Sequence, residues 1–188
     1  PFTTHHNSLD QDLYLRIADE LYLKRLIIGG IDKVYELSKN FRNEGMDRNH
    51  NPEFTMLEWY EAYADYETMM EFVEEMIRTA AKDIGSLNLN WGGLEIDLSK
   101  LFERKPFLDL LKEATGKDVS TSDETQLRKM CDEHQISVAP NANYGQLLDE
   151  LMKRLVEPKL INPTFVIDYP KAISPLAKIH RNGNPEIV

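Results

Sequence analysis

The stretch VYELSKNFRNEGMDRNHNPEFTMLEWYEAY, residues 34–63, decides how this chain folds and where its chemistry lies. Two runs of alternating side chains, 34–42 and 54–63, flank a loop of polar, Gly and Pro residues. That pattern predicts an antiparallel hairpin with a long tip. Successive side chains along a strand point to opposite faces, so each strand of the hairpin should have one polar and one apolar face.

One face of the predicted hairpin carries charged, polar and aromatic side chains: Glu36, Ser38, Asn40, Arg42, Phe54, Met56, Glu58 and Tyr60. The opposite face carries large apolar groups and should be the packing surface: Tyr35, Leu37, Phe41, Leu57 and Trp59. A sheet rarely gathers so many charges on one face without a ligand to meet them. The polar face is therefore the candidate binding surface.

These residue types indicate what could bind. The guanidinium of Arg42 is a rigid fork of donors that matches a phosphate or carboxylate. The ring of Phe54 is a flat platform for a base. Glu58 and Tyr60 form an anionic, hydrogen-bonding pocket suited to an ammonium group.

The loop adds two groups. Glu44 could hold a guanidinium or accept a hydrogen bond from an amino group, and His50 could reach a distal phosphate. The alternative is a surface hairpin with cross-strand ion pairs worth about 0.2–1 kcal/mol each. Spacing alone does not decide between the two readings.

Six segments together resemble a known family. They are THHN (4–7), YLRIADELYLKR (14–25), FRNEG (41–45), HNPEFTMLEWY (50–60), AYADY (62–66) and ISPLAK (173–178). The three within 41–66 resemble motif 2 of the class II aminoacyl-tRNA synthetases, in the form carried by lysyl-tRNA synthetases. The others resemble parts of the same catalytic core. The match is dense over 1–84 and returns over 162–181.

The resemblance implies an α+β fold, an antiparallel sheet flanked by helices and bearing a helical insertion. It implies that lysine and ATP give lysyl-adenylate and pyrophosphate, and that the lysyl group then moves to tRNA(Lys). Arg42 would be the catalytic residue. The residues implied to contact lysine are Glu20, Glu58 and Tyr60, and those implied to contact ATP are Arg42, Glu44, His50, Asn51 and Phe54.

The resemblance also sets expectations for partners and cofactors. ATP would be a substrate. Mg²⁺ is expected in the parent enzyme, with its ligands outside this chain and no metal site within it. The parent would be a cytoplasmic homodimer that does not engage a membrane.

The chain begins at Pro1, without a methionine and within a motif, and is predicted to be a fragment. Motif 1, which builds the family's dimer interface, and motif 3 would lie outside it, so the isolated piece should be weakly active or inactive. Two alternatives stay open. One is the related enzyme that attaches lysine to translation elongation factor P, and the other is a non-catalytic interaction domain on the synthetase scaffold.

Composition narrows the function classes. A chain of 188 residues with 41% hydrophobic content suits one domain with a smaller insertion. Its net charge of −10 argues against a free-standing nucleic-acid binder. The single cysteine, Cys131, cannot form an internal disulfide, fits a reducing compartment and should be a buried structural thiol. No apolar run approaches the roughly 20 residues that span a bilayer.

The pattern changes from strand-rich to helical in the middle of the chain, and the resemblance then implies three segments: a catalytic core with the hairpin over 1–98, a helical insertion over 99–159, and a return to the core sheet over 160–188. Predicted helices cover 20–28 with Asp19 as N-cap, 66–84 with Asp65 as cap, 106–115 and 144–157, and a further helix begins after Ser122 or Asp123 as its cap and runs to about 134. Strands are predicted at 13–17 and 164–169, the latter pairing with 173–179, and a second hairpin at 87–97.

Overall fold

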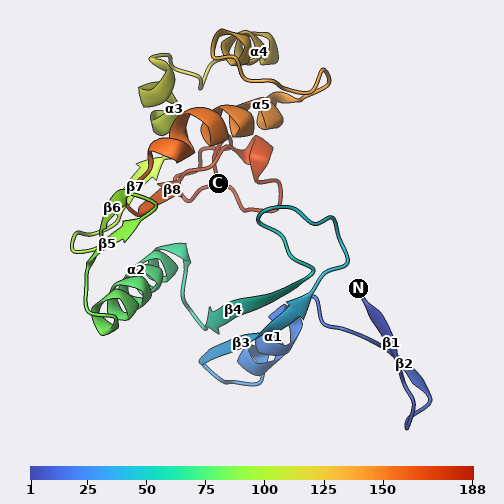
Figure 1. The fold of residues 1–188 in the computed structure, drawn as a ribbon. Helices are drawn as coiled ribbons and strands as arrows, with labels where there is room; N and C mark the ends of the chain where they lie inside the picture. The colour runs from blue at the N-terminus through green and yellow to red at the C-terminus, as the bar shows by residue number, and fades with distance from the viewer. The chain divides into compact units, whose positions relative to one another are not determined.

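The computed structural model describes residues 1–188, and the chain forms two compact units, Pro1–Met69 and Met70–Val188. Helices and short two-stranded sheets alternate along it (Figure 1). Three of the sheets are antiparallel and one is parallel. The predicted α+β class is confirmed.

The first unit is built around the predicted hairpin, which is present as β3, Lys33–Phe41, and β4, Glu53–Glu61. Before it come the antiparallel pair β1, Thr3–His6, and β2, Gln11–Tyr14, and the helix α1, Glu20–Ile28. The strand predicted at 13–17 ends at Tyr14. Residues 16 and 17 instead lie against the end of β3, where the Phe41 N–H donates to the Arg16 carbonyl over 2.8 Å.

The apolar face of the β3–β4 hairpin was predicted to be the packed face, but in the structure it is the polar face that is covered. Helix α1 packs against both strands (Figure 1). The polar face is buried or half-buried, whereas on the apolar face the exposed fractions of Tyr35 and Leu37 are 75% and 66%. The expected packing role of the apolar face is therefore wrong for this chain. The polar groups can be buried because they hydrogen-bond to one another.

Helix α1 has the predicted bounds, but most of its leucine side chains are not buried. Of its leucines only Leu23 is buried, at 3% exposed, while Leu21 is 66% exposed. Asp19 occupies the N-cap position, but its side chain makes no capping hydrogen bond. Its carboxylate is turned toward β3 instead, as described below.

Helix α2, Tyr66–Asp83, begins as predicted, because the Asp65 carboxylate accepts from the Thr68 N–H over 3.0 Å. The second hairpin is also present as β5, Asn88–Trp91, and β6, Leu94–Asp97. Both residues of its turn have positive φ, 59° at Gly92 and 84° at Gly93, a conformation that glycine adopts without steric strain.

Three further helices form the main hydrophobic core: α3, Phe107–Thr115, α4, Glu124–Glu133, and α5, Tyr144–Leu151. The predicted helix 144–157 continues past α5 as a π-helical turn, Met152–Val156, and a 3₁₀ turn, Glu157–Lys159. The buried side chains of this core are Phe107, Leu110, Leu111, Val119, Leu127, Met130, Cys131, Ile136, Ala142, Leu147, Leu148, Leu151, Met152 and Val156.

The Cys131 thiol is buried in this core, as predicted, and burial raises its pKa. A buried thiol with a raised pKa is a poor nucleophile. Nearby, Gly145 lets α5 approach the 3₁₀ turn Lys171–Ile173 closely. An added Cβ at Gly145 would lie 2.7 Å from the Ala172 carbonyl oxygen.

The strand predicted at 164–169 is present as β8, Thr164–Ile167, but its neighbour differs from the prediction. It pairs in parallel with β7, Glu103–Pro106, in the register Glu103↔Thr164. The expected strand at 173–179 is wrong, since that segment begins in the Lys171–Ile173 turn and forms no strand. No helix in the chain combines the length and apolar character needed to cross a membrane.

Candidate functional site

The β3–β4 register places three of the predicted site residues, Phe54, Glu58 and Tyr60, on one face. Glu36 lies opposite Glu58, and Asn40 lies opposite Phe54. Directly opposed residues of an antiparallel pair share a face. Arg42 follows β3, and its N–H donates to the Pro52 carbonyl over 2.9 Å, which extends the pairing into the loop. The charges and rings therefore converge on one surface.

A cavity of about 180 Å³ lies where the hairpin meets its loop. Its lining includes every residue expected to contact ATP, and the full set is Arg42, Glu44, Gly45, Asn49, His50, Asn51 and Phe54. The guanidinium carbon of Arg42 lies 5.3 Å from the centre of the Phe54 ring, a cation–π contact. The Arg42 Nε donates to the Ile17 carbonyl over 3.1 Å. The Arg42 side chain is therefore held by this backbone carbonyl and not by the carboxylate of Glu44, which the sequence had suggested as a partner.

Asp47 organises the loop beside this cavity. Its carboxylate accepts from the Asn49 N–H over 2.7 Å and lies 2.8 Å from the His50 Nδ1. The hydrogen bond from the Asn49 N–H lowers the pKa of Asp47 most, and the hydrogen bond with the His50 ring lowers it further. Asp47 was not among the predicted site residues. The Asp-x-Asn spacing of Asp47 and Asn49 could have indicated its role, because aspartate side chains often accept a hydrogen bond from the backbone N–H two residues on.

A second group of site residues lies farther along the hairpin. The Tyr60 hydroxyl donates to the Glu58 carboxylate over 2.5 Å, as the proposed ammonium pocket requires. Burial, reinforced by the Glu58 carboxylate, raises the pKa of Tyr60, so the phenol stays protonated. The Glu20 carboxylate forms an ion pair with Lys24, whose ammonium lies 5.6 Å from the centre of the Tyr60 ring.

Lys24 was not among the predicted site residues, yet it brings a cation to the pocket expected to receive one. Its signal was the Glu-x-x-x-Lys spacing, which places Glu20 and Lys24 on one side of α1. Both side chains are about half exposed, at 49% and 50%. In this structure the ammonium of Lys24 pairs with Glu20 on α1 and lies over the ring of Tyr60 on β4.

A buried polar network lies beneath the same face. Asp19 and Asn40 are both fully buried, at 0% exposed. The Asp19 carboxylate accepts from Arg16 Nη1 over 3.0 Å, from Ser38 Oγ over 2.7 Å and from Asn40 Nδ2 over 3.2 Å. Burial by itself raises the pKa of Asp19, but these hydrogen bonds and the charge of Arg16 lower it below its ordinary value. The carboxylate is therefore ionised in the folded chain.

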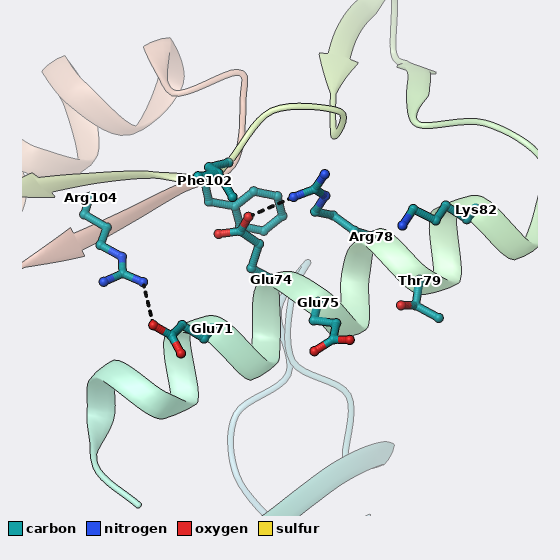
Figure 2. Close-up of a pocket in the computed structure, with 9 residues that line it drawn as sticks. Glu71, Glu74, Glu75, Arg78, Thr79, Lys82, Phe102 and Arg104 are labelled. Atoms are coloured by element: carbon teal, nitrogen blue, oxygen red, sulfur yellow. Dashed lines mark hydrogen bonds and ion pairs between the residues drawn. The ribbon is translucent and has the colours of Figure 1, made fainter.

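A larger cavity, about 650 Å³, lies in the second unit along α2 and contains none of the predicted site residues. Figure 2 shows two facing pairs of charged side chains in it. Arg78 Nη1 lies 3.2 Å from the Glu74 carboxylate, and Arg104 Nη2 lies 3.9 Å from that of Glu71. Because the smaller cavity of the hairpin gathers the residues predicted for ATP and this one has none of them, we place the candidate site at the hairpin.

The chain holds no cluster of three or more His, Cys, Asp or Glu side chains arranged to bind a metal ion. Its acidic site residues are instead engaged by protein groups, Glu58 by Tyr60 and Glu20 by Lys24. The residues present therefore offer no preformed set of protein ligands for Mg²⁺.

Sequence comparison agrees with this geometry. The family model described as tRNA synthetases class II (D, K and N) matches residues 1–187. A lysine–tRNA ligase from Porphyromonas gingivalis is 50% identical over 188 residues, and one from Aquifex aeolicus is 50% identical over 191. Both alignments cover 100% of this chain and 32% of the relative.

A lysine–tRNA ligase from Carboxydothermus hydrogenoformans is 50% identical over 189 residues, which cover 100% of this chain and 38% of the relative. The chain thus spans about a third of the length of these relatives. With the motif 2 hairpin formed and the family model matched over nearly its whole length, the chain belongs to the class II tRNA synthetases of the D, K and N group.

Proposed function

We propose that this chain is part of the catalytic domain of a lysine–tRNA ligase, which activates lysine with ATP and transfers it to tRNA(Lys). The observation that carries the proposal is the β3–β4 register, which aligns a cation, an aromatic ring and an acidic pocket on one face. Family membership supports the reaction class, and the 50% identity to lysine–tRNA ligases supports lysine as the amino acid.

In the first step, a carboxylate oxygen of lysine attacks the α-phosphorus of ATP, and the bond to the β-phosphate breaks to release pyrophosphate. Two anions must be brought together for this attack, so positioning and charge neutralisation supply the catalysis. Arg42 is the catalytic residue, because its guanidinium can contact both anions. In the second step, a terminal ribose hydroxyl of the tRNA attacks the lysyl carbonyl and AMP leaves.

The cavity at the loop would hold the nucleotide. Phe54 would stack on adenine, and Arg42, which lies over that ring in the free chain, would turn to the α-phosphate. Glu44 and Asn51 would contact the base, and His50 the outer phosphates. The 180 Å³ space is smaller than a nucleotide, so this cavity would hold only part of ATP.

The acidic pocket would hold lysine. Glu58 and Tyr60 already form a hydrogen-bonded pair, and Glu20 adds a second carboxylate. Two carboxylates complement the two ammonium groups of lysine, and one of them must exchange the ammonium of Lys24 for that of the ligand. Electrostatic selection of this kind favours lysine over aspartate or asparagine.

The wider assignments belong to the same proposal. Segments 1–98 and 160–188 form the catalytic core, with 99–159 as a helical insertion. The parent enzyme is a cytoplasmic homodimer that uses Mg²⁺ held by residues outside this chain. The chain alone is weakly active or inactive.

The test is amino-acid-dependent exchange of pyrophosphate into ATP by the full-length protein that carries this chain. Exchange should require lysine and not aspartate or asparagine. Glu58→Gln should raise KM for lysine about 10- to 100-fold with little change for ATP, because hydrogen bonds to charged groups contribute about 1.5–3 kcal/mol. The matched control is Glu61→Gln, since Glu61 pairs with Lys33 at 2.8 Å and lies outside both groups of site residues.

Equal weakening of lysine and ATP by Glu58→Gln would contradict the role of the pocket. Absence of any exchange would favour the non-catalytic interaction domain. If lysine activation occurs but the lysyl group passes to translation elongation factor P and not to tRNA(Lys), the related protein-lysylating enzyme is the correct assignment.

A further inference from the structure

The segment 16–19 crosses from β2 to α1 and contacts both groups of site residues. At its start, the Arg16 carbonyl accepts from the Phe41 N–H over 2.8 Å, and the Ile17 carbonyl accepts from the Arg42 Nε over 3.1 Å. At its end, Asp19 directly precedes Glu20, the first residue of α1. The segment therefore holds the catalytic guanidinium at one end and places a lysine-pocket carboxylate at the other.

Asp19 fastens this segment to the hairpin. Its carboxylate accepts from Ser38 and Asn40, both on β3, and from Arg16, whose guanidinium also pairs with Glu36. The side-chain oxygen of Asn40 has no hydrogen-bond partner, so the bond to Asp19 is the one its buried amide makes. Removal of the Asp19 carboxylate would leave that amide with none.

This arrangement differs from ordinary helix capping. An aspartate at an N-cap usually accepts from backbone N–H groups of the first turn. Asp19 makes no such bond, and its fully buried carboxylate is directed to the strand. Burying an ion is unfavourable unless partners satisfy it, so three donors on Asp19 fix its position closely.

We propose that Asp19 is a positioning residue that fixes Glu20 and Arg42 relative to each other, and so aligns the lysine carboxylate with the α-phosphate. The inference rests on the proposed lysine activation. It assigns a role to a residue that touches neither substrate. Misalignment of reacting groups by about 1 Å can slow a reaction about 10²-fold, so a small shift of the segment is enough for a measurable effect.

The test uses the full-length protein that carries this chain, with pyrophosphate exchange measured per folded molecule. Asp19→Asn has nearly the same shape but points an amide donor at the donors of Ser38, Asn40 or Arg16. We expect kcat to fall about 10- to 100-fold, with KM for lysine and for ATP each rising less than about 3-fold. A purely structural role would reduce the folded fraction and leave kcat per folded molecule unchanged.

Two further variants complete the design. Asp123→Asn makes the same chemical change at the N-cap of α4, where Asp123 accepts from the Gln126 N–H over 2.8 Å, and it should leave kcat and KM unchanged. Ser38→Ala removes one of the three donors to Asp19 and should lower kcat by several fold. In the double variant with Asp19→Asn, the Ser38 effect should largely disappear, because both act through one network.

The outcomes separate the two proposals. If the unmodified protein shows no lysine-dependent exchange, the proposed function is wrong. If it does, and both Asp19→Asn and Ser38→Ala have the kcat of Asp123→Asn, the positioning role of Asp19 is wrong while the function stands. If Asp19→Asn does not fold, Ser38→Ala alone decides, and an unchanged kcat overturns the inference.

Discussion

The hairpin unit, residues 1–69, and the helical core, residues 107–156, bury opposite kinds of side chain. In the hairpin unit the fully buried side chains are Asp19 and Asn40, and Leu23 is its one buried hydrophobic residue. In the helical core, leucines such as Leu111, Leu147 and Leu148 are 0% exposed. One region concentrates charge and hydrogen bonds, and the other concentrates apolar contacts.

Most of the stability and most of the proposed chemistry therefore reside in different regions of the chain. Burial of leucine side chains stabilises the helical core in proportion to the apolar area removed from water. The hairpin unit gains less from this source and depends on hydrogen bonds with definite geometry. Such bonds contribute little net stability but specify positions, which is what a site for two substrates needs. Four predictions test this division.

The largest expected effect is in the helical core. Leu148→Ala leaves a cavity among side chains that are fully buried and should lower the free energy of unfolding of the chain by about 2–5 kcal/mol. Its matched control is Leu37→Ala on β3, whose side chain is 66% exposed and should contribute less than about 1 kcal/mol. Denaturant unfolding followed by circular dichroism measures both. Similar losses of unfolding free energy for the two leucine variants would contradict the view that the helical core contributes more stability than the hairpin.

The next effect is catalytic and lies in the hairpin. Arg42→Ala should reduce the proposed lysine activation about 10²–10³-fold, because the charge that meets the α-phosphate is lost. Its stability cost should stay near 1 kcal/mol, the net contribution of one hydrogen bond. Lys39→Ala, which removes a cation paired with Glu53 at 3.4 Å outside the cavity, should leave activity intact. An active Arg42→Ala protein would refute the assigned role.

A smaller effect distinguishes two aspartates of α4, Asp123 at its N-cap and Asp132 in its last turn. Asp123→Ala should destabilise the chain by about 1 kcal/mol, because it removes the capping box of α4. Asp132→Ala, an exposed change on the same helix, should fall within about 0.5 kcal/mol of the original chain. Thermal unfolding of both variants provides the measurement. A cap variant as stable as its control would show that the box contributes nothing here.

The smallest effect is a pH dependence confined to the hairpin unit. The pKa of Asp19 is lowered in the folded chain, so its stabilising contribution is complete above the ordinary aspartate pKa, about 3.9, and is lost as pH falls through the lowered value. Acid should therefore loosen the hairpin. Trp59 fluorescence reports this in a Trp91→Phe background, and Asp19→Asn should flatten the profile below about pH 4. An unchanged profile would contradict the argument.

Much of the local structure could be predicted because its causes are local. The capping box of Asp123 sets the start of α4, Gly29 follows the last residue of α1, and the Gly92–Gly93 turn sets the second hairpin. Strand alternation correctly grouped Glu58 and Tyr60 with the face that bears Arg42. The residues predicted to contact ATP line one cavity because they all lie within a short stretch of the chain, residues 42–54.

The errors concern contacts between distant residues. The partner of β8 is β7, about sixty positions earlier, and no local pattern selects between that strand and the nearer segment 173–179. The exposure of the apolar hairpin face was likewise unpredictable, because alternation defines two faces but does not say which one a helix will cover. Asp19 was predicted as a cap because its sequence neighbours favour one.

Spacing along the chain was enough to predict the helices, the two hairpins, the family resemblance and the set of residues on the polar face. Three features followed from the tertiary structure alone: α1 covers that face, the ammonium of Lys24 lies over the Tyr60 ring, and Asp19 joins segment 16–19 to β3. These depend on hydrogen bonds and packing between residues about 20 or more positions apart. Such contacts are selected by the whole fold, because a buried carboxylate is stable only where the folded chain brings donors to it.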